Sequence, residues 1–243
     1  MEKEMALMRR LLGEISGRED CRRVLLSVKY NQISRINLLL LKLLLEHRGM
    51  RGVFVTIDRP HQYMAYLLRL NKVNHDKLIF IDMISRYSGG AEITAGNVRF
   101  GSGPFGTTDL LRMMESGGAA LGQASVDMGL VDFIMIDNLS AMLVYNDLPE
   151  VSTFVQRYLS LIERYGRIFT AIVIDVESNH ELYRTLCGLC QKALRISVDG
   201  TLEPLEALPE AESDKGSEVS ESVLIYTPHK GRPFFPHPIT GGG

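Results

Sequence analysis

Six near-continuous apolar runs of strand length, separated by stretches with helical periodicity, constrain the fold of this chain most strongly. A strand that is apolar on both faces needs helices on both faces of its sheet, which is the arrangement of parallel sheets. The alternation of strands and helices therefore predicts an α/β fold with a doubly wound, mostly parallel central sheet flanked by helices. The six runs are residues 24–28, 53–57, 78–83, 131–136, 168–174 and 194–198.

Helical periodicity predicts five helices between these runs. Ser34 is expected to be the N-cap of the first of them. The Leu-rich segment that follows Ser34 is apolar on nearly every face, which predicts a buried central helix. The expected helices are residues 34–47, 60–70, 108–123, 149–165 and 178–190.

Both ends of the chain depart from this regular middle. Near the start, Met5, Met8, Leu12 and Ile15 recur at helical spacing and predict an amphipathic helix. Near the end, one stretch carries seven acids against one lysine with few large apolar residues, which is typical of a mobile loop. The expected organisation is an N-terminal helix at 1–20 and one domain at 21–243, with an acidic mobile loop at 203–222 and a C-terminal strand and tail at 223–243.

Composition limits the classes of function. With 45% hydrophobic residues the chain can bury a core, and a net charge of −2 supplies no basic field, so no nucleic-acid partner is expected. The longest apolar stretch, 36–45, is far shorter than the ~20 residues that span a bilayer, so no membrane segment is expected. Acids lie among the bases at the N-terminus, which is unlike a signal peptide and predicts a cytoplasmic protein.

The turn between the first strand and the Leu-rich helix, residues 29–35, stands where an α/β protein can bind phosphate. A P-loop needs glycines that let backbone N–H groups converge, and a lysine that reaches the phosphates. Here Ile33 occupies the place of the last glycine and Ser34 the place of the lysine. We expect an ordinary strand-to-helix connection, with a weak phosphate site at the helix N-terminus as the alternative.

A second glycine-rich stretch, "GSGPFGTT" at 101–108, matches the G-x-G-x-x-G pattern of dinucleotide-binding loops. It follows only a weak strand, and Pro104 removes one backbone N–H that a phosphate would need. The favoured interpretation is a flexible loop in which Thr107 or Thr108 caps the next helix.

Cysteine and histidine do not form a convincing site. Cys187 and Cys190 are a C-x-x-C pair with His180 upstream, but a closed zinc site needs four ligands and no second pair is present. Both thiols would share one face of a helix, which favours a buried apolar role over metal or redox chemistry. The six histidines are scattered, so no Ser-His-Asp order can be argued.

The segment 131–174 carries the most specific motif in the chain. Four apolar residues at 133–136 precede Asp137, and a serine-containing stretch at 138–141 follows. This block resembles the Walker B strand of the RecA superfamily and is most similar to that of the KaiC-like ATPases. The order of elements agrees with that family over about residues 20–240, so the resemblance implies a RecA-like fold.

The departures from this family are as informative as the match. KaiC-like ATPases carry an acidic pair after the second strand, where this chain has Asp58 and Arg59. Without the lysine and the glycines, most of the electrostatic stabilisation of phosphoryl transfer is missing. The resemblance thus implies a degenerate P-loop and a pseudo-ATPase, a RecA/KaiC-like domain that has kept the fold and lost the ATPase activity. Lys230 and Arg232 resemble a family pair that reaches a neighbouring subunit's nucleotide, and a solvated tail is the other interpretation of them.

From the resemblance we expect a non-catalytic subunit or regulator that acts through protein–protein association, with no catalytic residue, no metal and no cofactor. The expected partners are further copies in a homo-oligomer or a paralogous RecA/KaiC-like ATPase. The alternative is an ATP-binding ATPase or nucleotide sensor, with Lys29 or Arg35 on phosphate and Asp137 on Mg²⁺. The remnant nucleotide site would consist of Asn31, Gln32, Ser34, Arg35, Asp58 and Asp137.

Overall fold

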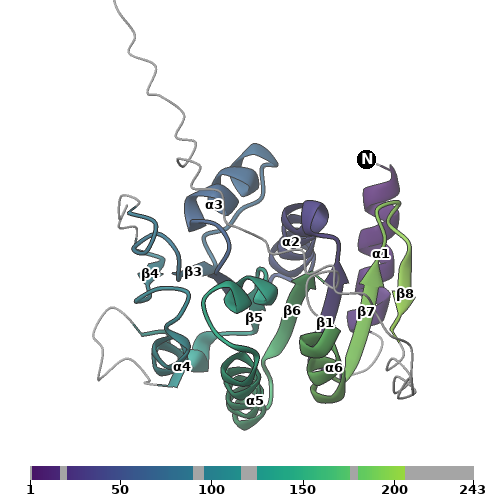
Figure 1. The fold of residues 1–243 in the computed structure, drawn as a ribbon. Coiled ribbons are helices and arrows are strands. Elements are labelled where there is room, and N and C mark those ends of the chain that lie inside the picture. The colour runs from purple at the N-terminus through teal and green to yellow at the C-terminus, as the bar shows by residue number, and fades with distance from the viewer. Residues whose placement is uncertain (1, 17–20, 90–95, 116–124, 176–179, 206–243) are drawn as a thin grey trace, which may run out of the picture. The chain divides into compact units, whose positions relative to one another are not determined.

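The computed structural model describes residues 2–16, 21–89, 96–115, 125–175 and 180–205, which belong to one compact unit (Figure 1). The strands in these residues are β1 Arg23–Val28, β2 Gly52–Thr56, β3 Leu78–Asp82, β4 Val98–Phe100, β5 Phe133–Ile136, β6 Phe169–Asp175, β7 Lys192–Ile196 and β8 Leu202–Pro204. These eight described strands form one sheet in the order β4-β3-β2-β5-β6-β1-β7-β8. All neighbours run parallel except β7 and β8, which are antiparallel.

Helices cover both faces of this sheet, as the near-continuous apolar strands require (Figure 1). One face is covered by α1 Glu2–Ser16, α2 Ile33–Lys42 and α3 His61–Leu70. The other face is covered by α4 Thr107–Glu115, α5 Leu148–Tyr165 and α6 His180–Leu189. The shorter helical turns are η1 Tyr30–Gln32, η2 Leu43–His47, η4 Met128–Leu130 and η5 Leu139–Val144.

Strand β1 illustrates how the sequence produces two cores. Val24, Leu26 and Val28 point to the face that packs on α2, while Leu25 points to the face that packs on α5. All four side chains are fully buried. The architecture is the doubly wound, mostly parallel α/β fold that the sequence predicts.

The Leu-rich segment is the buried central helix, as predicted. Leu40 and Leu41 in α2 and Leu44 in η2 are almost completely inaccessible to solvent. The last turn widens into a π-helix, in which the N–H of Arg48 donates to the carbonyl of Leu43 at 3.1 Å. This turn carries the chain to the amino end of β2.

Two boundaries differ from the prediction. Helix α2 begins at Ile33, its N-cap is Gln32, and no side chain caps it, so the prediction of Ser34 as N-cap is wrong. The backbone already turns in η1, before Ser34, so the helix starts one residue earlier than predicted. The stretch 203–222 does not begin as a loop, because Glu203 and Pro204 belong to β8. The rest of that stretch and the predicted tail lie outside the described residues.

Among the described residues, no helix combines the length and the hydropathy that crossing a bilayer demands.

Candidate functional site

The carboxyl ends of β1, β2 and β5 meet at one edge of the sheet, where α/β proteins bind their ligands. Three of the six predicted site residues, Ser34, Asp58 and Asp137, line one small cavity there. Gln32 and Arg35 do not line it. Arg35 Nη1 donates to Gln32 Oε1 at 3.2 Å, and Arg35 Nε lies 3.6 Å from a carboxylate oxygen of Glu4 in α1.

The connection between β1 and α2 is only four residues long, from Lys29 to Gln32. Asn31 lies in its middle, inside η1, and is exposed. The N–H of Gln32 donates to the carbonyl of Lys29 at 2.8 Å, so this amide is used within the turn. A phosphate cradle needs several such amides free and converging. The Gln32 amide is therefore not available to a phosphate in this conformation.

Asp137 is held inside the protein by its own backbone surroundings. Its Oδ1 accepts hydrogen bonds from the N–H groups of Ile57 at 3.0 Å and Asn138 at 2.7 Å. Asn37 of α2 donates to the Asp137 carbonyl at 3.0 Å, which ties the central helix to the end of β5. The residue is 6% exposed.

Burial raises the pKa of Asp137 from its ordinary value of 3.8 to about 7. The neighbouring charge of Asp58 adds to the rise, while the backbone hydrogen bonds of Ile57 and Asn138 oppose it. Near neutral pH a large share of the Asp137 side chain is therefore protonated. Since a carboxylate must be ionised to hold a metal ion, this environment works against Mg²⁺.

The Arg59 side chain covers the cavity beside Ser34, Asp58 and Asp137. Its Nη1 donates to Ser34 Oγ at 3.3 Å, its Nε lies 3.7 Å from Asp58 Oδ2, and its guanidinium stacks 4.8 Å from the ring centroid of Tyr63. Tyr30 extends from the other side and donates to Asp58 Oδ1 at 3.4 Å. The guanidinium thus lies at the first turn of α2, where a helix N-terminus would hold a phosphate.

The space that remains is small. The cavity beside Ser34, Asp58 and Asp137 has a volume of about 20 Å³. A single water needs about 10–15 Å³ on this scale, whereas ligand pockets measure about 300–1,000 Å³. The residues at this edge therefore do not fit ATP with Mg²⁺ in the described conformation.

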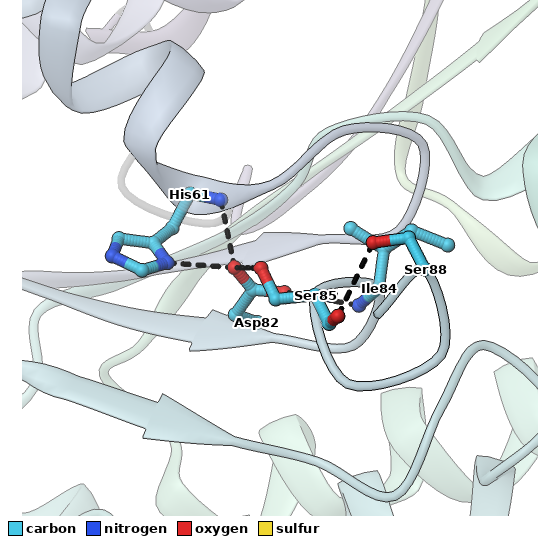
Figure 2. A network of polar contacts seen from close by, with 5 residues as sticks. All are labelled: His61, Asp82, Ile84, Ser85 and Ser88. Carbon is cyan, nitrogen blue, oxygen red and sulfur yellow. Dashed lines mark hydrogen bonds and ion pairs between the residues drawn. The ribbon is translucent and has the colours of Figure 1, made fainter. Parts of the chain in front are cut away.

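A second buried aspartate lies at the same edge, at the end of β3. Asp82 Oδ2 accepts hydrogen bonds from the His61 N–H at 2.8 Å and the Ser85 Oγ at 2.8 Å, and lies 2.6 Å from His61 Nδ1 (Figure 2). Its Oδ1 accepts from the N–H groups of Ile84 at 3.0 Å and Ser85 at 2.8 Å. Burial alone would raise the pKa of Asp82, but the hydrogen bonds from His61 and Ser85 hold it below its ordinary value of 3.8.

This network joins two elements. His61 is the first residue of α3, and the N-cap, Pro60, has no side chain that can accept a hydrogen bond. Asp82 supplies the missing acceptor from the neighbouring strand, and it also anchors the loop after β3. Ser85 bonds to the aspartate and not to the histidine, so the three side chains are not a nucleophile–base–acid triad (Figure 2).

The remaining motifs are structural. Around the glycine-rich loop, the N–H of Ser102 donates to Asp109 Oδ2 at 2.8 Å, and the N–H of Gly106 donates to the carbonyl of Gly103 at 2.9 Å. Helix α4 begins at Thr107, whose hydroxyl donates to Glu150 Oε1 at 3.3 Å. The amides of Ser102 and Gly106 are thus already engaged and not available to a phosphate in this conformation.

The C-x-x-C thiols, for which a buried apolar role was predicted, pack against the core and are partly buried. Burial raises the pKa of Cys190 to about 12 and also raises the pKa of Cys187. A thiol in this state is a poor nucleophile and metal ligand. In the described ranges, no group of three or more His, Cys, Asp or Glu side chains could hold a metal ion. Lys230 and Arg232 lie outside the described residues.

No protein-family model matches the chain, and no curated protein is similar to it. Several solved structures are similar. The crystal structure of the uncharacterized protein PH0321 from Pyrococcus horikoshii, in complex with an unknown peptide, has a TM-score of 0.52 at 14% identity, covering 80% of this chain and 86% of that one. This likeness shows a shared fold only.

Two further solved structures are similar at lower scores. The KaiC-like protein PH0186 from Pyrococcus horikoshii OT3 has a TM-score of 0.48 at 11% identity, covering 71% of each chain. The flagellar accessory protein FlaH from Methanocaldococcus jannaschii has a TM-score of 0.47 at 15% identity, covering 79% of this chain and 80% of that one.

Proposed function

We propose that the chain is a non-catalytic RecA/KaiC-like subunit or regulator that acts through association with other proteins. The observation that supports it most is the closed site at the carboxyl edge. Arg59 lies against Ser34, and a cavity of about 20 Å³ is all that remains beside Asp137. Phosphoryl transfer depends on electrostatic stabilisation of the phosphates, and here Ser34 stands in the place of the P-loop lysine and Ile33 in the place of its last glycine.

Exposed aromatic side chains beside the closed site favour association. The ring of Tyr87 lies 5.7 Å from that of Phe105 and 5.2 Å from that of Tyr145, measured between centroids. Tyr87 is 54% exposed and Phe105 is 48% exposed. Aromatic residues are enriched in protein interfaces, where they contribute much of the binding energy. We call Tyr87, Phe105 and Tyr145 the aromatic patch.

The proposed partner at the aromatic patch is another copy of the chain or a paralogous RecA/KaiC-like ATPase. PH0321, which has a similar fold, was crystallised with an unknown peptide, so a protein of this architecture can bind another polypeptide. The proposal includes no nucleotide and no metal as cofactor.

Sedimentation velocity of the full chain, alone and mixed with a KaiC-like paralogue from the same genome, tests the proposal. We expect a complex that forms equally with and without Mg-ATP and that is weakened in Tyr87→Ser. The matched control is Tyr66→Ser in α3, where the tyrosine is 56% exposed outside the patch. A chain that stays monomeric in both experiments contradicts the proposal.

The same experiment separates the alternative. A nucleotide sensor would assemble or dissociate on addition of Mg-ATP, and Asp137→Asn would abolish that response. Such a result would require Arg59 to leave Ser34, because the described conformation has no room for a triphosphate.

A further inference from the structure

A second cavity lies at the opposite edge of the sheet, where the strands begin. It has a volume of about 390 Å³, within the range of about 300–1,000 Å³ that ligand pockets occupy. It is bounded by α1, by η2 and by the first residue of β6. Its apolar lining consists of Leu12, Ile15, Leu43, Leu44, Met50 and Phe169. We call this cavity the amino-edge groove.

Three arginines surround this apolar lining. Arg22, Arg48 and Arg167 all line the groove and are exposed. Among the described residues that line it, none is acidic. The whole chain has a net charge of −2, so this concentration of positive charge is local and contrasts with the rest of the molecule.

The arginines are held in different ways. Arg167 Nη2 donates to the carbonyl of Gly129, which fixes its direction. The backbone N–H of Arg22 donates to Gln191 Oε1 at 2.7 Å, whereas its guanidinium makes no hydrogen bond or ion pair to another described residue. Arg22 also lines a neighbouring cavity of about 280 Å³ together with Arg23. The Arg22 guanidinium therefore has all of its donors available for an anion.

An apolar lining with guanidinium groups around it complements a ligand with an apolar body and negative charge beside it. Guanidinium groups bind carboxylates through two parallel hydrogen bonds, as they also bind phosphates. An extended acidic polypeptide places several carboxylates along its length, so one segment can meet more than one of the arginines that line the groove.

We propose that the amino-edge groove binds an acidic segment of a partner protein, with a bulky apolar side chain packed on Met50 and Phe169 and carboxylates on Arg22 and Arg167. The groove lies at the opposite edge from the aromatic patch, so this interaction is separate from the association proposed above and can succeed or fail independently of it.

Fluorescence anisotropy with the full chain tests this proposal. The probe is a fluorescein-labelled peptide, Asp-Glu-Leu-Phe-Asp-Glu, titrated up to about 1 mM protein. We expect saturable binding that weakens as salt is added, because the contacts are between charges. The same peptide with Asn and Gln in place of the acids should bind about tenfold more weakly or not at all.

Variants assign the binding to the groove. Arg22→Gln should weaken binding about tenfold, with an unchanged melting temperature because the side chain is exposed. Arg112→Gln, an exposed arginine of α4 on the other face of the sheet, is the matched control and should leave binding unchanged.

Three results would overturn the proposal. These are equal losses in Arg22→Gln and Arg112→Gln, equal binding of the acidic and the neutral peptide, and no binding of the acidic peptide. If decanoate binds in an Arg22-dependent manner while the peptide does not, the groove is a site for a small anionic amphiphile and the peptide assignment is wrong.

Discussion

Asp82 and Asp137 lie at the same edge of one sheet, both buried, yet their carboxyl groups are shifted in opposite directions. The pKa of Asp82 is lowered, while burial raises the pKa of Asp137 to about 7. The difference lies in the donors that each carboxyl receives. Asp82 interacts with five donor groups from His61, Ile84 and Ser85, and these include the imidazole and a hydroxyl.

Asp137 receives backbone N–H donors only and has the negative charge of Asp58 nearby. Its surroundings also leave Thr56 Oγ1 and Asn37 Oδ1 buried without a hydrogen-bond partner among the described residues. Since buried polar groups are normally satisfied, this incomplete pairing is unusual. Asp82 is therefore fully hydrogen-bonded and joins two elements of the structure. Around Asp137, by contrast, Arg59 covers the site, but buried polar atoms beneath it still lack hydrogen-bond partners among the described residues.

Removing the Asp82 carboxyl should have the largest effect. Asp82→Ala leaves the donors of His61 and Ser85 buried without an acceptor, which should cost about 3–5 kcal/mol of the free energy of unfolding. Guanidinium chloride unfolding of the variant measures it. Asp76→Ala is the control, an exposed aspartate that should change stability by less than about 0.5 kcal/mol. A loss below about 1 kcal/mol for Asp82→Ala would mean that the network does not stabilise the fold.

The pH dependence of stability should show the opposite behaviour of the two aspartates. Because the folded-state pKa of Asp137 is about 7 against 3.8 ordinarily, the folded state binds more protons between these values. Stability should therefore fall as pH rises from about 4 to 7, by on the order of 2–4 kcal/mol from this group. Asp82, with its lowered pKa, contributes stability above about pH 4 that is lost as pH falls.

The substitution Asp137→Asn isolates the loss of stability that ionisation of Asp137 causes as pH rises. The amide oxygen can accept the same two backbone hydrogen bonds from Ile57 and Asn138, but the side chain cannot ionise. Urea unfolding of wild type and variant between pH 5 and about 8 should show the variant gaining in relative stability as pH rises. Parallel curves would show that Asp137 ionises normally and would remove the contrast with Asp82.

Arg59→Ala should open the site at a modest cost. The Arg59 side chain is 41% exposed, so losing its contacts with Ser34, Asp58 and Tyr63 should lower the free energy of unfolding by about 0.5–1 kcal/mol. Thermal unfolding measures this loss. A loss above about 2 kcal/mol would show that Arg59 is part of the core structure and not only a cover over the site.

The smallest effect is expected for Ser34→Ala. Loss of a helix N-cap costs about 1 kcal/mol, but α2 is not capped by Ser34. The variant loses only the bond from Arg59, so we expect a change below about 0.5 kcal/mol in urea unfolding. A loss of about 1 kcal/mol in the free energy of unfolding would indicate that Ser34 is the N-cap and would contradict the described start of α2.

Much of the fold could be predicted from the sequence because it depends on local apolar patterns. Local apolar patterns were enough to identify the Leu-rich helix and the strands β1, β2 and β3. Tertiary contacts reinforce these local preferences and do not override them. The sequence also shows directly that the connection from Lys29 to Gln32 contains no glycine. Asp58 and Asp137 were selected from the resemblance to the KaiC-like motifs, and both line the small cavity beside Ser34.

The rest depended on contacts between distant segments. Nothing local shows that Arg59 reaches Ser34, 25 residues earlier, or that Asp82 accepts from the N–H of His61, 21 residues earlier. The sequence did contain one signal for the Asp82 contact. Pro60 precedes α3 and has no side chain that can cap the helix, so the first amides of α3 need an acceptor from another segment. The strand β8 was missed because a proline and acids disfavour strands locally, while pairing with β7 outweighs that preference.

Thermal unfolding with about 5 mM Mg-ATP tests the central claim most directly, since a ligand that binds only the folded state raises the melting temperature. Because the connection before α2 lacks the glycines and the lysine of a P-loop, even a site opened by Arg59→Ala should not hold a triphosphate. Addition of Mg-ATP should therefore leave the melting temperature of the wild type and that of Arg59→Ala each unchanged. A nucleotide bound at 100 times its Kd would raise the melting temperature by roughly 5–10 °C for a chain of this size. Such a rise in the wild type, abolished by Asp137→Ala, would contradict the claim.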